Sequence, residues 1–173
     1  FAEAQLAKVR RSAQEVLQAL LETQSRLELR GVDQWAADDF LTASGIAVEG
    51  DALYRAQNFD EAEALYQQAL DSLIALEARL NDEIDSRLTL LLEAIESGDE
   101  TTAGAIAPLV QQMGPDSDAV FDAVERVTLM PDIADLEAAA KASFEQSRFS
   151  TAVSQIDEAL GLDPAHQRLA KVA

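Results

Sequence analysis

Apolar residues recur along this chain at every third or fourth position, which is the period of an amphipathic helix. The clearest stripe lies near the start and contains Leu6, Val9, Ala13, Val16, Leu20 and Leu27. Gly31 follows as a stop signal, so we expect a long first helix that ends near Leu29. No segment alternates apolar and polar residues between turn signals, so the pattern predicts no strand.

Sparse glycine and proline residues divide the remainder of the chain into further predicted helices. They cover about 34–57, 61–97, 101–113, 117–129, 132–146 and 150–161, with a short helix after Pro164. Asp33, Asp60 and Ser117 are the expected N-caps. Pro131 is expected to separate two helices, and the helix after Asp60 could break near Asn81-Asp82. Because every link is short, neighbouring helices should form antiparallel hairpins.

Charge is unevenly distributed along the chain. Its 173 residues include 32 acidic and 13 basic side chains, for a formal net charge of −19. Residues 1–30 carry +1, whereas residues 31–100 carry −14. This asymmetry favours a solvated helical face, and a functional acidic surface is the alternative.

Composition also narrows the class of protein. The 48% of hydrophobic residues exclude an acidic disordered tail and are enough for a core. Nucleic acid is not an expected partner, because phosphate binding requires clustered lysine and arginine. No stretch of about 18 apolar residues occurs, so we expect no membrane insertion within this chain. The absence of cysteine removes disulfides and thiolate chemistry.

Candidate catalytic or metal-binding residues are few. The single histidine, His166, cannot form a multi-histidine metal site and is expected at the surface. Acidic pairs such as Asp38-Asp39 lack the spacing of a calcium-binding loop. We therefore expect no catalytic residue, no metal and no cofactor. An enzyme built on paired carboxylates is the least favoured hypothesis, since that chemistry needs a cleft that shifts one pKa.

Three segments share a spacing of aromatic and small residues. In two of them an aromatic residue, an alanine, a large apolar residue and a second alanine follow at intervals of three, four and three. These two segments are Phe59, Ala62, Tyr66, Ala69 and Phe149, Ala152, Ile156, Ala159. A middle segment keeps Gly98, Ala103 and Pro115. The small alanines let paired helices approach closely, and the large residue fills the groove of the next hairpin.

This pattern resembles the tetratricopeptide repeat. The resemblance implies an all-α fold of antiparallel helical hairpins, stacked as a right-handed array. The expected domains are a long amphipathic helix over 1–30 and a repeat domain over 31–173, with hairpins at about 34–80, 84–129 and 132–173. The array should be irregular, because Ile74 stands where the family has a closing proline. Pro115 and Pro164 are also 49 residues apart, compared with the family period of about 34.

The resemblance also implies a function. In the family, the first helix of each hairpin lines a concave peptide-binding face, which here would contain Asp51, Tyr54, Arg55, Leu88, Leu92, Glu137, Lys141 and Phe144. We therefore expect a non-catalytic protein–protein interaction module that binds an apolar, basic or amphipathic segment. Acidic chaperone tails would be poor ligands, because Ala47 and Asp51 occupy positions where that clamp needs Lys and Asn. In the alternative packing, Leu88, Leu92 and Ile95 are buried against the long first helix.

A second resemblance concerns the context of the chain. The run Leu129-Met130-Pro131 and the segments 138–149 and 159–164 resemble helical regions of bacterial envelope proteins with sulfatase-modifying-factor-like domains. Together with a start at Phe1, this predicts a fragment of a longer protein. The alternative function is therefore a structural spacer or regulatory segment of a larger, membrane-anchored bacterial protein. Cytoplasmic and periplasmic locations both stay open, as does the oligomeric state.

Overall fold

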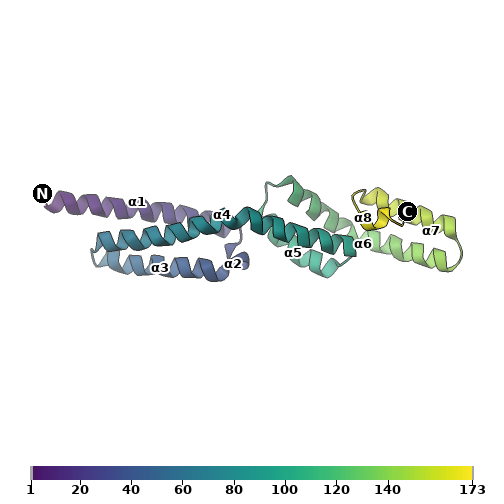
Figure 1. Ribbon diagram of the computed structural model, residues 1–173, viewed down its shortest axis with the longest axis horizontal. Coiled ribbons are helices and arrows are strands. Elements are labelled where there is room, and N and C mark those ends of the chain that lie inside the picture. Colours follow the sequence, from purple (N-terminus) through teal and green to yellow (C-terminus); the bar gives the residue numbers. More distant parts are fainter. Residues whose placement is uncertain (1, 173) are drawn as a thin grey trace. The chain divides into compact units, whose positions relative to one another are not determined.

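The computed structural model describes residues 2–172, and every regular element in this range is a helix (Figure 1). The helices are α1 (Ala2–Leu29), α2 (Val32–Trp35), α3 (Ala37–Arg55), α4 (Phe59–Ser97), α5 (Glu100–Met113), α6 (Asp118–Glu145), α7 (Phe149–Leu162) and α8 (Gln167–Ala170). The prediction of an all-α protein is confirmed. None of the helices in the described range has the length and apolar character needed to cross a membrane.

The chain divides into two compact units, and the division falls inside α4 between Glu83 and Ile84. The first unit covers residues 1–83 and the second covers residues 84–173. The domain boundaries expected from the sequence stay a prediction.

The first unit is a bundle of α1, α3 and the first part of α4, with the short helix α2 at one end. Helix α3 turns back into α4 and runs antiparallel to it (Figure 1). Ser12 contacts Glu63 and Arg26 contacts Glu77, so both contacts join residues 51 positions apart. This constant separation means that α1 and α4 run in the same direction. The core between the helices contains Ala13, Leu20, Leu27, Ala43, Ala62, Tyr66, Ala69 and Leu73.

The second unit contains the remainder of α4, the helices α5 to α7 and the short helix α8. Its core has two clusters. One contains Leu91, Ala94, Ile95, Ala103, Ala107, Ala123 and Met130. The other contains Ile133, Ala159 and Leu169, and it joins α6 to α7 and α8. Helices α6 and α7 form an antiparallel hairpin, as the sequence predicts.

The helix boundaries expected at Pro131 and Asp33 are wrong. Pro131 lies inside α6 and does not end it. Its neighbours Met130 and Ile133 are buried in different clusters, so core packing holds the helix together although proline removes one backbone hydrogen bond. Asp33 caps no long helix, because it lies within α2 and the chain bends at Ala36, where φ is −147°.

Other boundaries follow the sequence closely. Helix α1 ends at Leu29, and α4 runs to Ser97 without a break at Asn81-Asp82. The side chain of Ser117 accepts a hydrogen bond from the Val120 N–H and caps α6 as predicted. The expected N-cap at Asp60 is wrong, because Asp60 lies in the first turn of α4 and does not precede it.

Candidate binding groove

Two hairpin turns have the same backbone geometry. In the turn between α3 and α4, the N–H of Asn58 donates to the carbonyl of Leu53 at 2.9 Å, and Gln57 has a φ of 65°. This is a Schellman motif, in which a left-handed residue closes the helix. The same motif recurs 90 residues later between α6 and α7, where the N–H of Arg148 donates to the carbonyl of Ser143 at 2.9 Å.

Each of these turns carries an aromatic pair in edge-to-face contact. The ring centroids of Tyr54 and Phe59 are 5.0 Å apart with an interplanar angle of 66°. Those of Phe144 and Phe149 are 5.2 Å apart with an angle of 68°. Because 54 and 144, and 59 and 149, differ by the same 90 residues, the two hairpins are equivalent at both the backbone and the side-chain level. The sequence repeat included Phe59 and Phe149 but missed this pairing.

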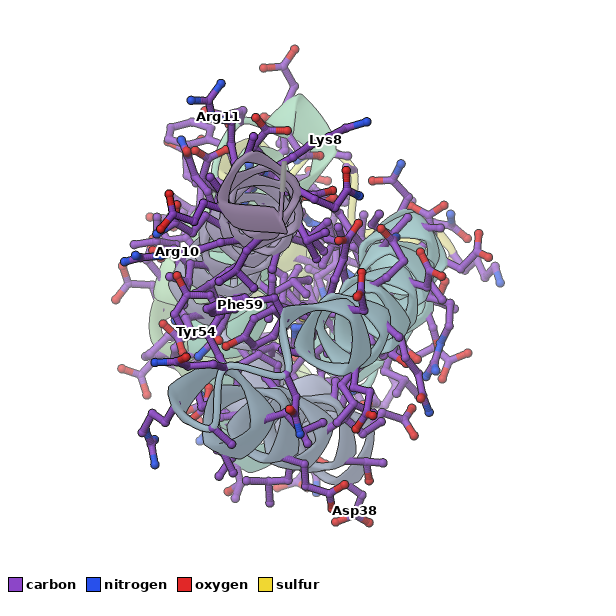
Figure 2. All side chains as sticks on the ribbon, turned by 90° about the vertical axis from the view of Figure 1, so that its left-hand side faces the viewer. Lys8, Arg10, Arg11, Asp38, Tyr54 and Phe59 are labelled. Carbon is purple, nitrogen blue, oxygen red and sulfur yellow. The ribbon has the colours of Figure 1, made fainter. Side chains whose placement is uncertain are left out.

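In the first unit, α1 covers the aromatic pair. Figure 2 shows Arg10, Tyr54 and Phe59 lying between α1 and the turn from α3 to α4. The Nε of Arg10 donates to the Tyr54 hydroxyl at 3.2 Å, and the Ser12 hydroxyl donates to Glu63 at 2.8 Å. Phe59 is only 8% exposed as a result.

In the second unit, the equivalent face is largely open. Phe144 is 63% exposed, Phe149 55% and Val153 48%. These side chains border a groove of about 370 Å³ between α6 and α7, which we call the α6–α7 groove. It is lined by Glu137, Ala140, Lys141, Phe144, Phe149, Ala152, Val153, Ile156 and Val172. Isolated exposed apolar residues are ordinary, but an apolar group around a hollow is typical of a binding surface.

Three of the residues predicted to bind peptide lie in this groove, namely Glu137, Lys141 and Phe144. Glu137 forms a two-pronged ion pair with Arg168, in which Nη2 lies 2.9 Å from Oε2. Lys141 and Phe144 are exposed at its surface. Phe149, Val153 and Val172 also line the groove, although the sequence analysis did not select them. The apolar pair Phe149 and Val153, four residues apart on one helix face, was the available signal.

Leu88 and Leu92 lie elsewhere in the second unit. Both are partly buried and pack against the cluster of α4, α5 and α6 residues that includes Ile95. The alternative packing expected from the sequence buried these side chains against the first helix, whereas here they pack against residues of α4, α5 and α6.

The remaining predicted binding residues belong to the first unit. Asp51 accepts a hydrogen bond from the Tyr66 hydroxyl at 2.7 Å. Burial and this hydrogen bond raise the pKa of Tyr66. Tyr54 binds Arg10, and Arg55 is exposed in the last turn of α3. The structure therefore gathers three of the eight predicted residues around one groove.

A wider depression of about 710 Å³ lies near the end of α4, but charged groups already satisfy one another there. Arg126 bridges Glu96 at 2.7 Å and Asp163 at 2.9 Å. The expectation of a surface histidine is wrong, since His166 is 2% exposed. Its Nδ1 is 3.0 Å from Glu96 Oε2 without the geometry of a hydrogen bond. The turn that begins at Asp163 folds His166 inward, where it precedes α8.

No protein-family model, curated protein or solved structure matches this chain. Within residues 2–172, no group of three histidine or acidic side chains is placed to hold a metal ion.

Proposed function

We propose that this chain is a non-catalytic protein–protein interaction module with a tetratricopeptide-like arrangement of hairpins. The observation that carries the proposal is the exposed aromatic pair Phe144 and Phe149, which borders a groove floored by Ala140 and Ala152. Exposed aromatic rings over small residues give a partner side chain both contact area and room to approach.

Backbone geometry supports the repeat character of the module. The turn between α4 and α5 is a third Schellman motif, with Gly98 at a φ of 74° and the Asp99 N–H donating to the Ala94 carbonyl at 2.9 Å. The left-handed residues Gln57, Gly98 and Ser147 each end the first helix of a hairpin. These are the three segments in which the sequence resembles the repeat family.

The groove is suited to an apolar or amphipathic ligand. Its lining is mainly apolar, and its two charged members are Glu137 and Lys141. Glu137 is already paired with Arg168, so Lys141 is the side chain best placed to orient a polar group of the ligand. Such a combination gives affinity through apolar burial and selectivity through a small number of polar contacts.

Selection from a peptide library displayed on phage tests this function. We expect the folded chain to enrich apolar or amphipathic peptides. The double variant Phe144→Ser, Phe149→Ser should bind these peptides at least about tenfold more weakly, because it lacks two exposed apolar side chains that the ligand would cover. Phe121→Ser is the matched control, since Phe121 is 64% exposed on α6 and does not line the groove. A chain that enriches no peptide, or a double variant that binds as well as the control, would contradict the proposal.

A further inference from the structure

We propose that the α6–α7 groove binds one basic amphipathic helix of a partner protein, lying parallel to α7 in the way that α1 lies along α4. This inference rests on the proposed function and specifies its ligand. Of the two equivalent hairpins within the chain, one is already covered by a helix and the other is open.

The covered hairpin shows where a helix can lie. Helix α1 runs in the same direction as α4 and contacts it through Ser12 and Glu63. The position equivalent to Glu63, 90 residues later, is Val153, which lines the α6–α7 groove. The position equivalent to Tyr54, which binds Arg10, is Phe144, and it lines the same groove. Both contact points of α1 therefore have open counterparts in the second unit.

The differences between the hairpins specify the side chains of the bound helix. Phe144 lacks the hydroxyl that Arg10 binds, and Val153 replaces the carboxylate that Ser12 binds. A helix in the groove should therefore carry apolar residues at both corresponding positions. Elsewhere it should keep the stripe of α1, in which apolar residues recur every three or four positions.

The length of the contact is limited by α7. This helix ends at Leu162, whereas α4 continues beyond the equivalent position. Its 14 residues span about 21 Å, which corresponds to about four helical turns of the ligand. Val172 borders the groove and follows α8, so the end of the chain contributes to its wall.

At the groove itself Glu137 is paired with Arg168 and Lys141 is basic, so the preferred charge of the ligand follows from the net charge of the second unit as a whole. Residues 84–173 contain 16 acidic and six basic side chains, for a net charge of −10. The first unit shows the same complementarity, since Arg26 of α1 pairs with Glu77 of the acidic helix α4 at 2.8 Å. A bound helix that presents basic residues on its outer face is therefore favoured over an acidic one.

The probe is a synthetic peptide with the sequence of residues 3–21 of α1, carrying Arg10→Leu and Ser12→Val and a fluorescent label. A second version changes Glu3 and Glu15 to Lys, and a third changes Lys8 and Arg11 to Glu. Fluorescence anisotropy with the full chain should show saturable binding. The basic version should bind at least about tenfold more tightly than the acidic one at low salt.

Variants of the full chain test the location of the site. Val153→Glu should weaken peptide binding by at least about tenfold, because the bound helix would bury an unpaired carboxylate. Phe121→Ser should bind as the unmodified chain does. Circular dichroism of both variants should show unchanged helicity, which separates loss of the site from loss of the fold.

Cross-linking tests the direction in which the bound peptide runs along α7. A single introduced cysteine can be used, because the described chain has no cysteine of its own. In the first unit, Gln5 of α1 and Asp60 of α4 line one depression. Ser150 is the counterpart of Asp60, so a Ser150→Cys variant should form a disulfide with a cysteine at the N-terminus of the peptide when oxidised glutathione is added as the oxidant. A cysteine at the C-terminus should react far more slowly.

Three results of the peptide experiments would overturn the inference. They are absence of saturable peptide binding, equal binding by Val153→Glu, and faster cross-linking at the peptide C-terminus. A dimer of the unmodified chain that Val153→Glu dissolves would assign the groove to a second copy and would equally overturn the proposed occupant. If library peptides bind but are insensitive to Val153→Glu, the interaction function stands and this inference alone fails.

Discussion

Glu96 shows how single side chains hold the second unit together. It accepts hydrogen bonds from Arg126 Nη2 at 2.7 Å and from the Arg168 N–H at 3.1 Å, and it lies beside the buried ring of His166. Burial disfavours the ionised carboxylate, but the hydrogen bonds outweigh this effect and lower the pKa of Glu96. The folded state therefore favours the ionised form of Glu96.

The depressed pKa of Glu96 predicts a pH dependence of stability. A carboxylate with a lower pKa in the folded state stabilises the protein above its unfolded pKa of about 4.3, and this contribution is lost as the pH falls through the folded pKa. We expect the free energy of unfolding of the Glu96→Gln variant to change less between about pH 6 and pH 3 than that of the unmodified chain. Urea unfolding at both pH values measures this. An equal loss in both proteins would contradict the role assigned to Glu96.

The burial of His166 could not be predicted from the sequence. His166 is one residue among a polar stretch, and its neighbours in sequence give no sign of burial. It lies beside Glu96, which is 70 residues earlier in the chain, and Arg126 links Glu96 to Asp163, three residues before the histidine. Contacts between residues so far apart in the sequence depend on how the helices pack. The pattern of apolar and polar residues within one helix does not specify that packing.

At the scale of helices, close approach between α3 and α4 depends on one glycine. A Cβ atom added at Gly50 would lie 2.8 Å from Cε1 and 2.9 Å from Cδ1 of Tyr66. The Tyr66 ring is 1% exposed and its hydroxyl binds Asp51, so it has little freedom to move. The two helices are therefore spaced for a residue without a side chain at this point.

Two glycines of α3 give a matched pair of variants. Gly50→Ala should lower the free energy of unfolding by about 1–3 kcal/mol, because the added methyl group overpacks a rigid site. Gly45→Ala should raise it by up to about 1 kcal/mol, since nothing lies within 4 Å and alanine has the better helix propensity. Thermal and urea unfolding compare the two. A Gly50→Ala variant as stable as Gly45→Ala would contradict this expectation, because it would mean that α3 and α4 can move apart without lowering the free energy of unfolding.

Most helices could be predicted because amphipathic pattern and capping act over a few residues. The end of α1 near Leu29 and the cap at Ser117 are of this type. Pro131 misled the prediction because its local signal is strong, while Met130 and Ile133, which keep α6 continuous, owe their burial to other helices. The groove was only partly foreseen for the same reason. The repeat pattern placed Phe144 on a binding face. The exposure of Phe149 and Val153, however, depends on how the helices of the second unit pack together.

At the scale of the whole molecule, the dominant feature is the net charge of −19. The exposed ion pairs include Arg26–Glu77 and Arg79–Asp39, and pairs of this kind contribute little individually. Repulsion among the many acidic side chains opposes the compact state, and dissolved salt screens it.

Salt should therefore stabilise this protein. We expect its Tm to rise by a few degrees when NaCl is increased from about 10 mM to about 150 mM, because screening weakens the repulsion more than it weakens a small number of surface pairs. Differential scanning calorimetry at constant pH measures the change. A lower Tm at the higher salt concentration would mean that the ion pairs contribute more than the repulsion costs.

The repeated hairpin turns have a consequence for the order of folding. The hydrogen bonds that close the α6–α7 turn join residues three to five positions apart, and Phe144 and Phe149 are five positions apart. Contacts between residues close in sequence form quickly, because little chain entropy is lost when they close. Most of the groove comes from this one hairpin, so its aromatic wall can form early, before the distant contacts of Glu96 with the end of the chain are made.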